Sequence, residues 1–557
     1  MASQIYARAG ALVLAGWMTA CVQYIQPPTE APPSEKLAMA EALYRDATDL
    51  YFQVYVAEAL GTGRSPGGVA LGELRAAAQV LAERARERLD EVDASSLRGE
   101  DRRALDVMRS ELTSREVTTD GADGQGSADT SCRYDARALG AAGRDRLTDR
   151  IYACYSAAAA RVVVGGDTLD RLGVIARLAT EEQSARRRAL FIGLQPVWEA
   201  VNGRNTPDSP WRVLLPLSAD RWRRDGSPSD AAAASLGMNP GRVEPTLLEL
   251  LDAWRMAAPD TLVEPWDWYH QNGAVSRRLG SRVTRRDLER LNETFYVALG
   301  ASPKVLGIHY DLEPRDGKTA VAFTQFGGVP RRGPNGPVGA EPWIFATYRD
   351  GGFGNLVELL HETGHAIHIA AVDTRPAFAN WPDGDPFTEG LADAPALEAY
   401  EGRWQLATLG DSASRADNLR EKFGSVMLDV AWALFELRMH ADPTRDPNVE
   451  WTEITQRYLH IAPHPEWSWW AMRGQLIESP GYMMNYALGA MVAADVRARL
   501  VEVVGPMTPA PRRWYPRVSD ALYRHGRGRA PRDVLSDFLG RPVSPNGIVQ
   551  ELRGLSR

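Results

Sequence analysis

The segment that most limits the fold of this chain is His361-Glu362-Thr363-Gly364-His365, in which two histidines lie four positions apart. Residues at this spacing share one face of an α-helix, so the two imidazoles can act together only if the segment is helical. Asn355 and Glu358 have the spacing of a capping box, with Asn355 as the cap. The apolar residues between and after them give the helix sides that can be buried: Leu356, Val357, Leu359 and Leu360. The sequence therefore predicts a helix, capped by Asn355, that presents both histidines on one side.

This arrangement is typical of a zinc-binding helix. Two imidazoles one turn apart can hold one zinc ion, and Glu362 then lies beside the water that the ion binds. Zinc lowers the pKa of that water toward 7, and a carboxylate can take its proton as the water attacks a carbonyl carbon. The chain has 9 His in 557 residues, and the pattern arises by chance in about one such chain in a hundred. The alternative interpretation is a helix with incidental histidines.

A catalytic zinc ion needs a third protein ligand and one open position. Glu389 lies 28 positions after His361 and precedes a second helical stretch. Asp393 follows Glu389 by four positions, so it shares that face and can accept the distal N–H of a ligand histidine. His368 competes for the role of third ligand, but seven positions from His361 place it roughly 10 Å along the helix axis. We therefore expect His368 to be a neighbour of the metal site and not a ligand.

The runs HETGHAIH and PFTEGLADAPAL resemble the zinc core of the gluzincin peptidases. The spacing from the first His to Glu389, and the Glu-x-x-x-Asp pattern that follows, resemble the angiotensin-converting-enzyme family. The HExGHxxH form resembles the thimet oligopeptidase and oligoendopeptidase family, and so does the stretch HYDLEPRDGK that begins at His309. The resemblance covers residues 305–495, roughly a third of the chain, and is specific for the clan and not for one member.

The two family patterns nominate different metal carboxylates. In the thimet family this carboxylate lies just before an Ala-Pro pair, which would select Asp393, whereas the converting-enzyme spacing selects Glu389. We predict Glu389, because its spacing matches without a gap and leaves Asp393 to orient a ligand histidine. The resemblance further implies one zinc ion per chain, short peptide substrates, and a two-lobed, mainly helical body around a deep channel.

In both families a tyrosine, helped by a histidine, stabilises the oxyanion from a helix about a hundred residues after the metal carboxylate. Tyr482 and Tyr486 occupy that region here and resemble the Gly-Tyr-x-x-x-Tyr of the thimet family. The chain departs from both families at the partner histidine, since that place holds Gln475 or Ile477. A glutamine side chain can still donate a hydrogen bond. The alternative interpretation of the two tyrosines is a pair of aromatic core residues.

Two further segments bear on how a peptide would be held. Arg473 lies where the converting-enzyme pattern has a base that binds the substrate carboxylate; the alternative is a surface arginine. The run TAVAFTQFGG, which begins at Thr319, resembles the family's edge strand, along which an extended peptide adds as another strand. On balance the sequence favours cleavage within short peptides, as in an oligoendopeptidase, with release of carboxyl-terminal dipeptides as the alternative.

The remaining patterns indicate a mainly α fold. Apolar residues recur at helical spacing in 34–116, in 144–299 and after Gly354, while 117–131 is small and polar. Strand-like runs cluster in 305–348 as KVLGIHYDL, TAVAFTQF and PWIFATY. We therefore predict one small β-sheet beside the zinc helix, within a single catalytic domain that covers residues 37–557.

Residues 1–21 have the features of an export signal. Arg8 supplies positive charge, and residues 9–20 form an apolar run too short to span a membrane well. Met18-Thr19-Ala20-Cys21 resembles a bacterial lipoprotein cleavage box, which predicts a lipid on Cys21 and a place in the periplasm or cell envelope. The Pro-rich residues 22–36 predict a tether. The alternative is an ordinary N-terminal helix with an incidental cysteine.

The other cysteines are Cys132 and Cys154, an even pair that predicts a disulfide in an exported chain; the alternative is two unrelated thiols.

A formal net charge of -8 argues against a dedicated nucleic-acid binder. No feature indicates an oligomeric state. The rival to a peptidase is an envelope protein that keeps the zinc helix as a structural or binding element. The intact Glu362 and the open three-ligand set argue against this rival, and the missing partner histidine keeps it as an alternative.

Overall fold

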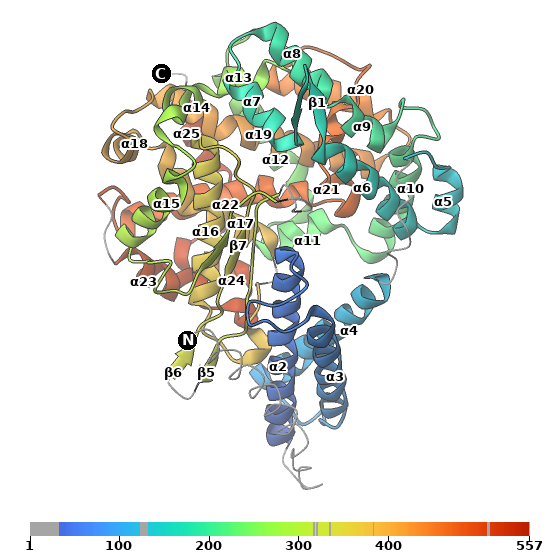
Figure 1. Cartoon of the computed structure of the whole chain (residues 1–557), viewed down its shortest axis with the longest axis vertical. Coiled ribbons are helices and arrows are strands. Elements are labelled where there is room, and N and C mark those ends of the chain that lie inside the picture. The colour runs from blue at the N-terminus through green and yellow to red at the C-terminus, as the bar shows by residue number, and fades with distance from the viewer. Residues whose placement is uncertain are drawn as a thin grey trace, which may run out of the picture.

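The computed structural model describes residues 33–122, 132–315, 318, 321–333, 336–382, 384–509 and 513–555. The predicted export signal, Cys21 and the tether as far as residue 32 lie outside the described residues. The described chain is mainly α-helical, which confirms the predicted fold class (Figure 1). The end of the predicted tether is wrong, because helix α2 already begins at Pro33, a residue that suits the first turn of a helix. Within the described residues, no helix combines the length and apolar character that a membrane span requires.

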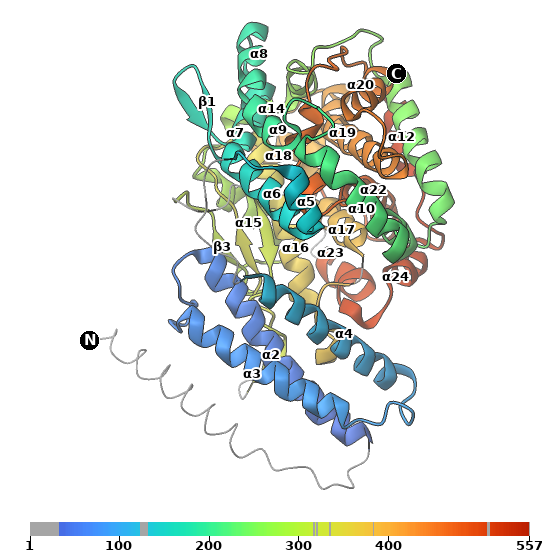
Figure 2. The same ribbon diagram turned by 90° about the vertical axis from the view of Figure 1, so that its right-hand side faces the viewer.

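The first helices form a lobe at one side of the body (Figure 2). They are α2 (Pro33–Leu60), α3 (Leu71–Asp90) and α4 (Gly99–Ala122). The lobe has an apolar core of its own, to which the body contributes Ala377 and Phe378. Phe52 of α2 stacks on Phe326 of the body with 4.8 Å between ring centroids. These contacts hold the lobe against the part of the body that carries the zinc helix.

Residues 132–299 form a second group of mostly short helices, which in Figure 1 extends across the upper part and the right of the body, with α15 at the left. Its elements are α5 (Ala136–Ala142), α6 (Arg144–Ala160), β1 (Val162–Val164), β2 (Asp167–Leu169), α7 (Arg171–Thr180), α8 (Ser184–Gly193), α9 (Gln195–Asn202), α10 (Pro210–Asp225), α11 (Pro228–Ser235), α12 (Val243–Ala257), α13 (Trp268–Asn272), α14 (Ala274–Leu279) and α15 (Asp287–Ala298). In the structure Cys154 of α6 is bonded to Cys132, and their Cα atoms lie 5.6 Å apart. The bond ties the start of this group to α6.

A three-stranded sheet lies beside the zinc helix, as predicted. Its strands are β3 (His309–Asp311), β4 (Phe323–Gln325) and β7 (Trp343–Phe345), in the order β3-β7-β4. β3 runs parallel to β7 and β4 antiparallel to it, so β4 is an edge strand. Two hairpins that the sequence analysis did not predict accompany it: β1 with β2, and β5 (Arg331–Gly333) with β6 (Gly336–Val338).

The remaining helices build the centre of the body. They are α16 (Phe353–Ala371), α17 (Asp385–Ala396), α18 (Gly402–Leu409), α19 (Arg415–Ala441), α20 (Pro447–Leu459), α21 (Gln475–Glu478), α22 (Met483–Val503), α23 (Trp514–Val518), α24 (Pro531–Leu539) and α25 (Asn546–Arg553). Helix α16 packs on α17, α17 on α22, and α22 on α19, through buried apolar side chains. The predicted zinc helix, α16, also contacts α14 and α15, and strands β4 and β7 of the sheet.

The predicted cap of the zinc helix is wrong. Helix α16 begins at Phe353 and follows Gly352, whose φ of 115° is open to glycine and strained for other residues. Asn355 therefore lies inside the first turn, and its amide donates to the backbone oxygens of Asp350 and Gly351 at 3.1 and 3.2 Å. The side chain ties the helix to the loop before it instead of capping the free N–H groups.

Candidate metal centre

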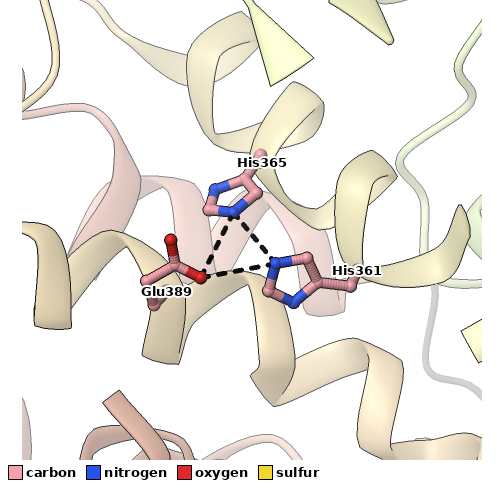
Figure 3. A group of neighbouring side chains, drawn as sticks. All are labelled: His361, His365 and Glu389. Atoms are coloured by element: carbon pink, nitrogen blue, oxygen red, sulfur yellow. Dashed lines mark hydrogen bonds and ion pairs between the residues drawn. The ribbon is translucent and has the colours of Figure 1, made fainter. Parts of the chain in front are cut away.

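The three predicted metal ligands converge in space (Figure 3). Nε2 of His361 lies 3.1 Å from Nε2 of His365 and 3.5 Å from Oε2 of Glu389. The distance from His365 Nε2 to the same carboxylate oxygen is 3.9 Å. One donor atom from each residue thus lies within 4.8 Å of the other two. Two imidazoles and one carboxylate at this spacing fit a zinc ion with three protein ligands and an open position.

Glycines let the two ligand-bearing helices approach closely. A Cβ on Gly364 of α16 would lie 2.6 Å from the backbone oxygen of Ala392 in α17. A Cβ on Gly390 would lie 2.6 Å from the backbone oxygen of Gly489 in α22. Any larger residue at either position would push α16, α17 and α22 apart, since real side chains do not pack at such distances. The glycine inside the His361–His365 segment therefore helps to bring Glu389 to the histidines.

Asp393 lies on the other side of the first histidine. Its Oδ1 accepts a hydrogen bond from Nδ1 of His361 at 2.7 Å, which leaves Nε2 of that ring facing Glu389. Burial lowers the pKa of His361, but the charges of Asp393 and Glu389 outweigh it and raise the pKa well above its usual value. Because this oxygen binds the distal nitrogen, Asp393 is placed to orient a ligand.

The other two histidines of the helix differ in environment. Burial, helped by charge on His361, lowers the pKa of His365 well below its usual value, so its imidazole is neutral and free to bind a metal. His368 is buried among aromatic rings, with its own ring stacked on that of Tyr523 at 4.8 Å. It is not part of the ligand group among the described residues. The structure therefore places His368 as a neighbour, where the sequence analysis expected it.

Glu362 points to the same centre from the side of the sheet. Its Oε2 accepts a hydrogen bond from the hydroxyl of Thr324 at 2.7 Å. Burial raises the pKa of Glu362 to about 7, although the charge of His361 and the Thr324 hydroxyl lower it. Thr324 lies on the edge strand β4. The sequence analysis recognised this strand but missed Thr324, whose only signal was its place in a strand expected to lie beside the zinc helix.

Tyr482 and Tyr486 both reach the centre from α22 and the turn before it. The hydroxyl of Tyr482 donates to Oε1 of Glu389 at 3.2 Å. The hydroxyl of Tyr486 accepts a hydrogen bond from Nε2 of Gln475 at 3.4 Å. The two rings lie 5.4 Å apart, and burial raises the pKa of each phenol above its usual value. Of the two residues found in place of the partner histidine, Gln475 reaches a tyrosine, while Ile477 is fully buried in the core.

Arg473 is a half-buried side chain and not a freely exposed surface arginine. Its guanidinium is ion-paired with Asp429 of α19 and lies over the ring of Trp432, 4.7 Å from the ring centroid. Its side chain is 23% exposed. The charge of Arg473 favours an ionised Asp429, but burial is the larger effect and raises the pKa of that carboxyl to about 6. Burial keeps the pKa of the Tyr486 phenol above its usual value, and the charge of Arg473 opposes this effect in part.

A cavity of about 900 Å³ adjoins the centre. Tyr482, Asp385 and Trp381 are among the residues that line it. The ring of Trp381 also packs edge-on against the ring of His365, with 5.7 Å between centroids. Two residues that line the cavity, Trp381 and Tyr482, thus contact predicted metal ligands, and the cavity is large enough for several residues of a peptide.

Comparison with known proteins identifies the fold. No family model and no curated protein matches the sequence. Among solved structures, the chain is similar to the crystal structure of an M32 carboxypeptidase from Deinococcus radiodurans R1. The sequences are 15% identical, the match covers 93% of this chain and 98% of that chain, and the TM-score is 0.54. At this identity the similarity shows a shared, mainly α fold over nearly the whole length of both chains.

Proposed function

We propose that the protein is a zinc-dependent peptidase that hydrolyses short peptides. The observation that carries the proposal is the convergence of His361, His365 and Glu389 around one point, with Glu362 beside them. The fold supports it, because the similar solved structure is that of a carboxypeptidase. Glu362 is held beside the predicted metal ligands by the hydroxyl of Thr324. A zinc protein without catalytic activity would not need a carboxylate in this position.

Each side chain has a separate task in this proposal. A zinc ion, when bound, would acidify a water molecule and polarise the scissile carbonyl. Glu362 takes the proton from the attacking water and later gives it to the leaving amine. Tyr482 and Tyr486 donate hydrogen bonds to the oxygen that becomes negative in the transition state. Gln475, which contacts Tyr486, replaces the histidine that the family resemblance led us to expect.

Two observations bear on where the peptide is cut. β4 is an edge strand, which would allow an extended peptide to pair with it and be cut at internal bonds, as the sequence analysis favoured. Arg473, however, is half-buried and its charge acts on Tyr486, and a guanidinium in this position can bind a terminal carboxylate. The similar solved structure is that of a carboxypeptidase. For both reasons we propose cleavage from the carboxyl end of the peptide, and keep the oligoendopeptidase mode as the alternative.

We also propose that the protein works outside the cytoplasm. The Cys132–Cys154 bond supports this, because disulfides persist in oxidising compartments. The predicted export signal agrees with it, and lipidation of Cys21 remains part of the proposal.

The variant Glu362→Gln tests the function. It keeps the three ligands, so it should bind zinc like the wild type, while peptide cleavage falls by about 10²–10⁴-fold because the general base is lost. Bound metal and cleavage of a mixed peptide library are measured on the same samples, with and without a chelator. Glu358→Gln, one turn earlier on the same helix and facing Tyr348, serves as the matched control.

Two outcomes would contradict the proposal. A zinc-loaded Glu362→Gln variant that cleaves at the wild-type rate would show that Glu362 is not the base. A wild-type protein that binds zinc and cleaves no peptide in the library would favour the rival, a zinc-binding envelope protein.

A further inference from the structure

A buried carboxylate outside the metal centre holds the chain on both sides of Tyr482. Glu436 of α19 is 1% exposed, and its two oxygens accept hydrogen bonds from the backbone N–H groups of Gly481 and Met483 at 2.8 and 3.2 Å. Within the part of the chain that the structure describes, Glu436 has no ion-pair partner. Burial raises the pKa of this carboxyl to about 8, although the two N–H groups lower it, so these are the polar contacts that offset part of the cost of burying it.

Met483 is the first residue of α22, and Gly481 lies in the turn two residues before it. The first N–H groups of a helix have no partner within the helix and carry a partial positive charge. Glu436 supplies acceptors for them from another helix, 45 positions earlier than Gly481 in the sequence. The Glu436 side chain therefore fixes both the position and the direction of the first turn of α22.

The opposite side of the turn is fixed as well. Gly481 has a φ of +96°, and a Cβ there would lie 2.9 Å from Cβ of Pro228 and 3.1 Å from Cζ2 of Trp222. The N–H of Tyr482 itself donates to the backbone oxygen of Ser479 at 2.9 Å. The turn is thus held between Glu436 on one side and the 222–228 region on the other.

The side chain held in this way ends at the metal centre. The hydroxyl of Tyr482 lies 3.2 Å from Oε1 of Glu389. A displacement of about 1 Å by a residue far from the chemistry can lower a rate by about 10²-fold, because catalysis depends on the geometry of the reacting groups. The position of the backbone at 481–483 therefore decides where this phenol meets the substrate.

We propose that Glu436 is a positioning residue that sets the phenol of Tyr482 at the metal centre by binding the amide groups on both sides of it. This inference rests on the proposed peptidase function. Glutamine in place of Glu436 would keep the size of the side chain, but its NH₂ group cannot accept a hydrogen bond. One of the two N–H groups would then lose its acceptor and the turn would shift.

The same helix offers a matched control. Glu421 of α19 also receives backbone N–H groups at the start of a helix, from Val275 at 2.7 Å and from Ser276 at 3.0 Å. That helix, α14, carries none of the residues that we assign to the metal centre. Glu421→Gln therefore removes the same kind of contact without touching Tyr482.

The experiment is a double-mutant cycle between Glu436→Gln and Tyr482→Phe, with Glu421→Gln beside it. We measure kcat and KM on one peptide, bound zinc and the thermal midpoint. Glu436→Gln should lower kcat by about 10–100-fold with little change in KM and with zinc retained. In the Tyr482→Phe background the same change should lower kcat by less than about threefold, since the group it positions is already gone. Glu421→Gln should lower the thermal midpoint and leave kcat close to the wild type.

Three results would overturn the inference: Glu436→Gln with wild-type kcat, an equal loss of kcat in both backgrounds, or wild-type kcat in Tyr482→Phe. Should Glu436→Gln not fold, Glu436→Asp, which keeps both oxygens but draws them back by one methylene, takes its place in the cycle. A wild type that is inactive with zinc bound would instead reject the proposed function, so the two failures are distinct.

Discussion

Nδ1 of His361 donates a hydrogen bond to Oδ1 of Asp393 at 2.7 Å, and this carboxylate follows Glu389 by one turn of α17. A single helix thus offers one carboxylate to the metal position and a second to the back of a ligand. This geometry agrees with our prediction of Glu389 as the ligand, and the choice between the two family patterns stays a prediction. It also explains why the ring of His361 turns Nε2 toward the centre.

The first prediction separates the two carboxylates by metal affinity. Glu389→Ala should lose most of its zinc affinity, because it removes a ligand. Asp393→Ala should weaken zinc binding by about 10–100-fold, because the ligand remains but is less well oriented. A competition titration with a chromophoric chelator measures both constants. Loss of the metal in Asp393→Ala together with retention in Glu389→Ala would show that the thimet pattern is the right one.

The second prediction concerns Thr324, whose hydroxyl donates to Glu362 at 2.7 Å. Thr324→Val has nearly the same shape but cannot donate, so the carboxylate loses a contact that holds it beside the attacking water. A hydrogen bond to a charged group contributes about 1.5–3 kcal/mol, so kcat/KM should fall by roughly tenfold or more. Zinc content should not change. Thr324→Ser retains the hydroxyl and is the control, and equal rates in the Val and Ser variants would remove Thr324 from the site.

The third prediction is a pH dependence of stability that comes from His440. This side chain is buried against Trp222, and its Nδ1 donates to the backbone oxygen of Glu436 at 2.9 Å. Burial lowers the pKa of His440 from 6.5 to about 4, although the backbone oxygen raises it. The unfolded chain therefore binds more protons between these values. The contribution of His440 to the free energy of unfolding is present above pH 6.5 and is lost as the pH falls toward 4.

From pH 7 to pH 5 this effect amounts to about 2 kcal/mol. The variant His440→Phe can still stack on Trp222 but has no group that titrates. Between pH 7 and pH 5, its free energy of unfolding should fall by about 2 kcal/mol less than that of the wild type. Urea unfolding of the zinc-free proteins at both pH values measures the difference. Parallel pH profiles for the two proteins would mean that His440 titrates normally in the folded state.

Sequence analysis found its site residues through two signals, helical spacing within one element and resemblance to known families. His361 and His365 are one turn apart, and Glu389 and Asp393 repeat that spacing on the next helix, so periodicity pairs the residues within each helix. The link between the two helices, and the place of Tyr482, came from the resemblance. Thr324 and Glu436 were missed because each acts on a residue 38 or 45 positions away. No local pattern encodes such a contact, which depends on how α16, α19, α22 and the sheet pack.

The capping error at Asn355 has a similar cause. Its spacing to Glu358 fits a capping box, but the glycine at position 352 lets the helix begin earlier, and Asn355 then lies inside the first turn. The capping-box spacing is present in the sequence, but the conformation of the preceding residue, Gly352, sets where the helix begins. The fold class was easier to predict, since helical periodicity is repeated along most of the chain.

The last prediction concerns the bond that is cut, and it depends on Arg473. Asp429 pairs with this guanidinium and Trp432 lies under it, so the side chain is held in place before any substrate arrives. A preorganised arginine of this kind can bind a terminal carboxylate through two parallel hydrogen bonds. Asp429 neutralises part of its charge, which would weaken that contact without abolishing it.

We expect cleavage to occur near the carboxyl end and to require a free carboxylate. One decapeptide is digested with a free C-terminus and again with an amidated one, and the products are read by mass. Amidation and Arg473→Ala should each raise KM strongly and lower release of terminal fragments, and the Ala variant should no longer distinguish the two peptides. Arg473→Lys keeps the charge but not the forked geometry, so it should recover part of the activity. The opposite outcome is that internal fragments form at equal rates from both peptides and that Arg473→Ala has no effect. This result would favour the edge of β4 as the site that binds the substrate, and therefore the oligoendopeptidase mode.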